Sequence, residues 1–207
     1  MMLQRYTPDE LLIKYRTIRG QITTEQFFRS PEHQKTQEMW CAAHFARAYN
    51  QHVAPCTALI SDKDEQTDAD FFLGTGGGIH PFQITERMEP GRRRGDEYQW
   101  GGSEKTQDEN WPKVTEQGSV WVRSAIDRKL NKKYAGTADL NLLVYLNFAA
   151  YEQQYEDMRS ECAQVAPQFA SVWLLTGNAL CCIHQNPALR AFQGWMMIPE
   201  SLVHSEP

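Results

Sequence analysis

The chain has 207 residues, and 21 Lys and Arg against 26 Asp and Glu give it a net charge of -5. This balance argues against a protein that coats nucleic acid by overall charge, but it allows an enzyme with a local basic face. The length predicts a single domain over 1–207. No segment is apolar enough for a membrane helix or a signal peptide, so we expect a cytoplasmic protein with no membrane partner.

Three helices are predicted in the N-terminal quarter. Thr7, followed by Pro8 and two acids, begins a helix that runs to about Gly20. A short helix is expected over 24–29. Ser30 and Pro31 begin a longer helix to about His52, whose buried stripe is predicted to contain Met39, Ala42, Ala43, Ala46, Tyr49 and Val53.

Three strands are predicted next. Residues 56–60 and 68–73 are short apolar runs separated by the polar turn 61–67. A glycine-rich turn at 74–78 leads into a third strand over 79–86. The last two strands should therefore form an antiparallel hairpin.

The second half of the chain begins with a segment that has no apolar period. Residues 87–118 contain five glycines, two prolines and thirteen charged residues, which predicts a long flexible loop. A helix over 119–134 and a strongly apolar strand over 139–148 follow. A helix over 151–165, strands over 170–175 and 179–184, and a C-terminal tail over 186–207 complete the prediction. This order indicates an α/β (α+β) fold, a mixed sheet flanked by helices.

Polar residues at the predicted hairpin indicate where chemistry could occur. Asp70 begins one strand, and Gln83 and Thr85 share one face of its partner. Pairing through the glycine turn brings Asp70 and Gln83 close together. Hard oxygen ligands of this kind suit Mg²⁺, which needs only one or two carboxylates besides water and a substrate phosphate. Asp70 is therefore the predicted metal ligand, and Mg²⁺ the predicted cofactor.

The pattern over 31–148 resembles the PD-(D/E)XK nuclease superfamily. The matching residues are Glu38 on the long helix, Asp70 on the second strand and Gln83 on the third. The resemblance implies a restriction-endonuclease-like fold with the core order helix, three strands, helix, strand. Here the core would carry extra N-terminal helices and C-terminal strands.

Three positions depart from the family pattern: Ala69 replaces a proline, Gln83 an acid and Thr85 the catalytic lysine. Three interpretations stay open. The lysine has migrated to the next helix, Glu86 serves as a shifted ligand, or the site has degenerated and the fold is kept for binding. The candidates for a migrated lysine are Lys129, Lys132 and Lys133.

Two basic segments are candidate nucleic-acid contacts. The helix over 119–134 is rich in cations, of which Arg123, Lys132 and Lys133 are predicted to bind phosphates. Arg92, Arg93 and Arg94 lie in the loop among aromatic residues, a composition suited to phosphate contact and base stacking. The alternative for this loop is a solvated segment, because it has seven acids beside its six bases.

Other motifs have simpler interpretations. The glycine run lacks the Gly-Lys-Ser/Thr of a phosphate loop and is expected to be a hairpin turn. Cys181, Cys182 and His184 lack a second Cys/His pair at zinc-finger spacing, so they and the other three cysteines are expected to be buried thiols.

The leading hypothesis is a metal-dependent nuclease with Glu38, Asp70, Gln83, Glu86 and Lys129 at its catalytic site. The alternative is an inactive nuclease-fold module that binds nucleic acid or a partner protein. A third hypothesis is a protein-interaction factor that uses exposed aromatic side chains as anchors. The oligomeric state is left open.

Overall fold

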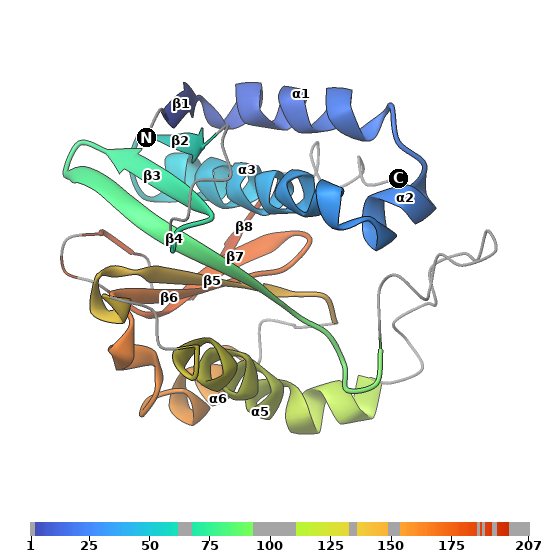
Figure 1. Cartoon of the computed structure of the whole chain (residues 1–207). Helices are drawn as coiled ribbons and strands as arrows, with labels where there is room; N and C mark the ends of the chain where they lie inside the picture. The colour runs from blue at the N-terminus through green and yellow to red at the C-terminus, as the bar shows by residue number, and fades with distance from the viewer. Residues whose placement is uncertain are drawn as a thin grey trace.

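The computed structural model describes residues 3–61, 68–92, 111–132, 136–148, 154–185, 187, 189–191 and 194–198. Eight strands of these residues form one mixed sheet in which spatial order follows chain order (Figure 1). Their bounds are β1 Leu3–Tyr6, β2 Cys56–Ser61, β3 Phe71–Thr75, β4 Gly78–Arg87, β5 Asn141–Leu146, β6 Ser171–Leu175, β7 Ala179–His184 and β8 Trp195–Met197.

The sheet is antiparallel at both sides and parallel in its centre. Strands β1 to β4 form an antiparallel series, β4, β5 and β6 run parallel, and β7 and β8 return antiparallel. Every residue of β5 is buried, because the central strand is covered on both faces. This explains its uninterrupted apolar sequence, Leu142 to Leu146.

Helices cover both faces of the sheet (Figure 1). One face carries α1 (Pro8–Arg19), α2 (Thr24–Arg29) and α3 (Gln34–His52), and the other carries α5 (Trp111–Leu130) and α6 (Tyr155–Glu161). Each face has its own hydrophobic core. Among the described residues, no helix is both long and apolar enough to cross a membrane.

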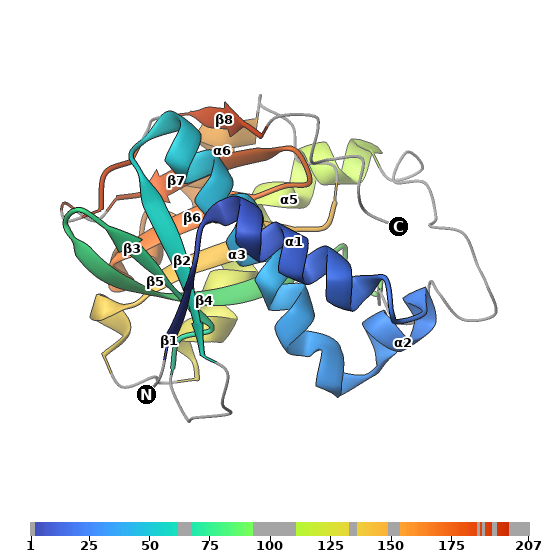
Figure 2. The ribbon, with the colours of Figure 1, turned by 90° about the horizontal axis from the view of Figure 1, so that it is seen from above.

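The mixed sheet flanked by helices confirms the predicted α/β (α+β) class. The order α3, β2, β3, β4, α5, β5 also matches the predicted series of helix, three strands, helix and strand. The predicted stripe on α3 is buried from Met39 to Tyr49, with Val53 half-buried after the helix end. The helix is also buried on its outer side because α1 lies over it (Figure 2).

The predicted bounds of the loop over 87–118 are wrong at both ends. Strand β4 includes Arg87, and α5 begins at Trp111 instead of Ser119. Pro112 is tolerated because the first turn of a helix needs no partner for its backbone N–H. Gly118 lies inside the helix where a Cβ would come within 3.0 Å of Gln154 Oε1, so close packing explains the glycine. Residues 93–110 lie outside the described part.

Two short edge strands were not predicted. Strand β1 pairs with β2. Strand β8, which lies in the segment 186–207 expected to be a tail, pairs with β7. Other differences are in length. Helix α5 ends at Leu130, and α6 covers only Tyr155–Glu161 of the helix expected over 151–165. A 3-10 turn over Pro31–His33 precedes α3.

Candidate functional site

Asp70 lies immediately before β3 and is tied to the partner strand of the hairpin. Its backbone N–H donates to Phe82 O at 2.8 Å, and its Oδ2 accepts from the Ile84 N–H at 2.6 Å. Burial raises the pKa of this carboxyl, while the Ile84 N–H and the charges of Lys129 and Lys132 lower it. The predicted approach of Asp70 to the third strand is confirmed.

Gln83 and Lys129 connect β4 with α5. The Lys129 ammonium donates to Gln83 Oε1 at 3.1 Å, and the Gln83 amide N–H donates to Asp68 O. Gln83 is buried and therefore has a fixed orientation, held by a bond at each end of its amide. The lysine reaches the third strand from the last turn of α5.

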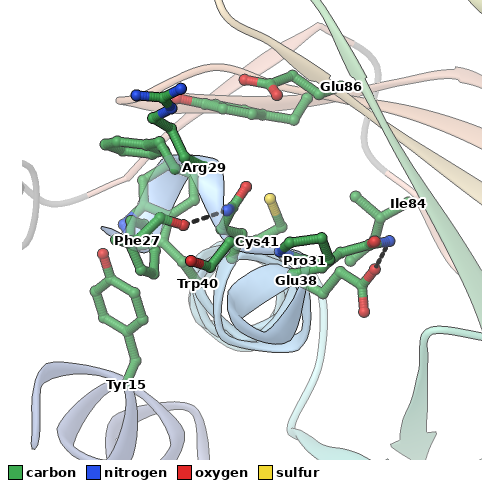
Figure 3. Close-up of a pocket in the computed structure, with 14 residues that line it drawn as sticks. Tyr15, Phe27, Arg29, Pro31, Glu38, Trp40, Cys41, Ile84 and Glu86 are labelled. Atoms are coloured by element: carbon green, nitrogen blue, oxygen red, sulfur yellow. Dashed lines mark hydrogen bonds between the residues drawn. The ribbon is translucent and has the colours of Figure 1, made fainter. Parts of the chain in front are cut away.

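Glu38 approaches the same place from α3 on the opposite face of the sheet. Its Oε1 accepts from the Gln34 side chain at 2.8 Å (Figure 3). Burial and the negative charge of Asp70 raise the pKa of Glu38 to about 7, although Lys129 acts in the opposite direction. Glu38 and Asp70 are therefore close enough to repel each other, and both are influenced by the same lysine.

The structure thus brings together four of the five predicted catalytic residues, from α3, the start of β3, β4 and α5. They are Glu38, Asp70, Gln83 and Lys129, and we call them the carboxylate–lysine cluster. Lys132 is exposed and contributes positive charge toward Asp70. Lys133 lies outside the described residues.

Glu86, the fifth predicted catalytic residue, lies apart from the cluster's hydrogen bonds. Its Oε1 accepts from Asn147 Nδ2 at 2.9 Å, and its side chain lines a pocket on the α3 face. Because side chains alternate along β4, Gln83 and Glu86 point to opposite faces.

The predicted phosphate contacts are distributed unevenly. Arg123 forms ion pairs with Glu161 at 3.0 Å and, more loosely, with Asp127 at 3.8 Å, so its charge is compensated. Arg92 donates to the Asn147 carbonyl oxygen at 2.8 Å. Arg93 and Arg94 lie outside the described residues.

The donor set of the cluster fits a hard divalent cation. In the described part of the chain, Asp70 and Glu38 each use one carboxylate oxygen in a hydrogen bond, and no partner occupies the other. No group of three or more His, Cys, Asp or Glu side chains suited to a metal occurs among the described residues. Two carboxylates are nevertheless enough for Mg²⁺, which retains waters and binds substrate phosphate.

A pocket of about 400 Å³ opens beside Glu38 on the α3 face. Tyr15 and Phe27 lie on one side of it and Glu38 and Ile84 on the other (Figure 3). Its lining combines aromatic rings with polar groups and also includes Phe28, Arg29, Ser30, Pro31, Gln34, Gln37, Trp40, Cys41, Glu86 and Tyr145. A site of this size and composition suits a planar ligand with polar edges.

The sequence-based prediction missed Arg87 as a site residue and included Arg128 only as one cation of the basic helix over 119–134. Both guanidinium groups lie beside the β4 face that carries Gln83 and Thr85. The alternation that places Gln83 and Thr85 together also places Arg87 on that face. That extension of the pattern was the available signal.

No protein-family model, curated protein or solved structure matches this chain.

Proposed function

We propose that this protein hydrolyses phosphodiester bonds of nucleic acid in a metal-dependent reaction. The observation that carries the proposal is the hydrogen bond from Lys129 to Gln83 beside the two interacting carboxylates. The segments that meet there are the ones a PD-(D/E)XK site would use, with the lysine supplied by the second core helix. The strand order over β2 to β5 supports a restriction-endonuclease-like core for the same reason.

Asp70 and Glu38 would hold Mg²⁺ through the oxygens that carry no hydrogen bond in the described part of the chain. When bound, Mg²⁺ lowers the pKa of its water and stabilises charge on the phosphoryl oxygens. The backbone N–H of Ile84 fixes Asp70, and Gln34 fixes Glu38. Both carboxylates therefore keep their positions without the cation.

Lys129 would donate a hydrogen bond to the attacking water or to a non-bridging phosphate oxygen. Gln83 accepts one of the three ammonium hydrogens at 3.1 Å and so orients the group. A neutral amide restrains the lysine without neutralising it. The positive charge of the ammonium would stabilise the negative transition state.

The pocket beside Glu38 supports a substrate with unstacked bases. Aromatic side chains bind the faces of single-stranded bases, and the polar groups of the pocket can contact base edges. A paired base inside a duplex cannot enter such a pocket unless it leaves the stack. We therefore expect single-stranded DNA or RNA to be cleaved faster than duplex.

The test is cleavage of labelled single-stranded and duplex DNA and RNA with Mg²⁺ or Mn²⁺. Asp70→Asn and Lys129→Met should each lower cleavage at least about 100-fold, because each removes a charge that acts on the transition state. Lys14→Met is the matched control, since Lys14 lies on α1 beside Tyr6. Full activity of Asp70→Asn would refute the assignment.

A binding module without catalysis is the second candidate, favoured by the bonding of Gln83. Both ends of this amide are engaged within the protein, and it stands where an acid would serve as a further ligand. Such a module predicts binding of nucleic acid or of a partner protein without turnover. Salt-sensitive binding of oligonucleotides, with no cleavage by the wild type under any metal condition, would select it.

A further inference from the structure

Two guanidinium groups lie together where β4 ends against the last turn of α5. Arg87 is the last residue of β4, and Arg128 precedes Lys129 on α5. Arg128 donates to Thr85 Oγ1 at 3.2 Å and lies 3.5 Å from the Glu86 carbonyl oxygen. These contacts hold its exposed side chain along the strand toward Arg87.

Neither guanidinium has a carboxylate partner among the described residues. The Arg87 Nε–H is buried and has no hydrogen-bond acceptor in the described part of the chain. Burial and the nearby positive charge of Arg128 both lower the pKa of Arg87. Two like charges held together in this way cost free energy, which an anion bound between them would recover.

The neighbouring cations make the contrast clear. Arg123, one turn earlier on α5, is paired with Glu161 and Asp127. Arg92 uses a guanidinium N–H on the Asn147 carbonyl oxygen. Among the described arginines of β4 and α5, Arg87 and Arg128 thus differ from Arg123 in forming no ion pair.

The pair also has a defined position relative to the carboxylate–lysine cluster. Gln83, Thr85 and Arg87 are alternate residues of one strand, so they share the face toward α5 and are spaced about 6.6 Å apart. Lys129 contacts the first of them and Arg128 the second. A nucleic-acid backbone that reaches Lys129 would therefore meet Arg128, the preceding residue of α5, and Arg87 at the end of β4.

We propose that Arg87 and Arg128 form a phosphate-binding site for the nucleic-acid backbone, adjacent to the phosphate at Lys129. The proposal rests on the proposed function for its ligand, and it adds a second, non-reacting phosphate contact. Guanidinium groups suit this task because their planar donors match two phosphate oxygens at once.

Binding is measured by fluorescence anisotropy with a labelled single-stranded oligonucleotide of about 12 nucleotides. EDTA is present, so the readout does not depend on hydrolysis. Arg87→Met and Arg128→Met should each weaken binding about fivefold to tenfold at low salt. Each should also reduce the slope of log K against log salt by about 0.7. Arg123→Met, which removes a paired charge from the same helix, should change affinity less than about twofold.

Three outcomes would overturn the site: no oligonucleotide binding by the wild type, equal behaviour of all three variants, or an unchanged salt slope. Arg87→Lys retains the charge and should keep most of the salt slope. If Arg87→Met unfolds, the exposed Arg128→Met decides alone. Inorganic phosphate, titrated at constant ionic strength, is the second arm. If inorganic phosphate displaces the oligonucleotide at a concentration equal to that of the oligonucleotide's own phosphate groups, the site binds a free anion and not the nucleic-acid backbone.

Loss of cleavage in Asp70→Asn bears on hydrolysis alone, whereas these binding results bear on the arginine site alone. A wild type that binds through Arg87 and Arg128 without cleaving would leave the site standing and refute the nuclease. Cleavage by the wild type, with unchanged binding in both arginine variants, would support the nuclease and refute the arginine site.

Discussion

Replacing Glu38 by Gln should stabilise the protein at alkaline pH and leave it unchanged in mild acid. The pKa of Glu38 rises from an ordinary value of 4.5 to about 7, chiefly through burial and then through Asp70. This rise corresponds to about 3 kcal/mol for ionising Glu38 in the folded protein. Since the folded state holds this proton more tightly than the unfolded state, wild-type stability falls as pH rises from 4.5 through 7.

The assay is urea unfolding of wild type and Glu38→Gln at about pH 4 and pH 8.5, because the lower value lies below the ordinary pKa of 4.5. Glutamine keeps the size of the side chain and its acceptor for Gln34. At the higher pH the variant should gain about 1–3 kcal/mol of unfolding free energy, the lower value applying where solvent screens the charge. At the lower pH the wild-type carboxyl is mostly protonated in the folded state and in the unfolded state, so the gain should nearly vanish.

Glu32→Gln is the matched control, because the Glu32 side chain is 74% exposed. It should change stability by less than about 0.5 kcal/mol at either pH. A Glu38→Gln variant that is destabilised at pH 8.5, or whose gain does not depend on pH, would refute the description of Glu38 as a half-buried carboxyl repelled by Asp70.

Mg²⁺ provides a second readout of the same pair of carboxylates. At ten times its dissociation constant, a cation that binds only the folded state adds about 1.4 kcal/mol of stability. The wild type should show this gain at pH 8.5 and much less at pH 5.5, where Glu38 is protonated. Glu38→Gln should respond weakly at both values, and an equal response of both proteins would remove Glu38 from the metal site.

Three further predictions concern stability and reactivity. Thr7→Ala should cost about 1 kcal/mol in chemical denaturation, because it removes the reciprocal capping bonds between Thr7 and Glu10. Gln154→Met should raise the melting temperature, since both polar atoms of the Gln154 amide are buried without a partner among the described residues and an unpaired polar group costs about 1–3 kcal/mol. The cysteines should react with iodoacetamide at pH 8 only after denaturation, because all five are buried. Burial also raises the pKa of Cys56, Cys162, Cys181 and Cys182. Modification of the folded protein would contradict this burial.

The centre of the fold could be predicted because its strands have strong local patterns. The apolar run at 142–146 can only be buried, and the glycine turn between β3 and β4 fixes a hairpin. The edge strands β1 and β8 have four and three residues, so neither develops an alternation that sequence analysis can recognise. These two strands form because they pair with β2 and β7, which their own short sequences do not reveal.

The start of α5 was missed because two local signals misled the prediction. Pro112 and Gly118 both indicate a loop when read as isolated residues. Proline is compatible with a first helical turn, and the glycine is required by the close approach of Gln154 and Phe148. Packing of this kind is a tertiary property that no local pattern reveals.

The candidate site divides in the same way. Asp70 and Gln83 could be placed together because they lie on one hairpin, and a short connection fixes their register. Lys129, Lys132 and Lys133 could not be separated from the sequence, since the choice depends on how α5 packs against β4. The structure places the Lys129 ammonium on Gln83, whereas Lys132 acts on Asp70 through its charge.

The packing of α5 gives one physical account of both departures on the third strand. A lysine at position 85 would share its place with Arg128, whose guanidinium donates to the Thr85 hydroxyl. An acid at position 83 would form an ion pair with Lys129, whereas Gln83 accepts a hydrogen bond from it. Under the proposed nuclease function, with the lysine supplied by α5, a neutral residue at 83 and a small acceptor at 85 suit this arrangement.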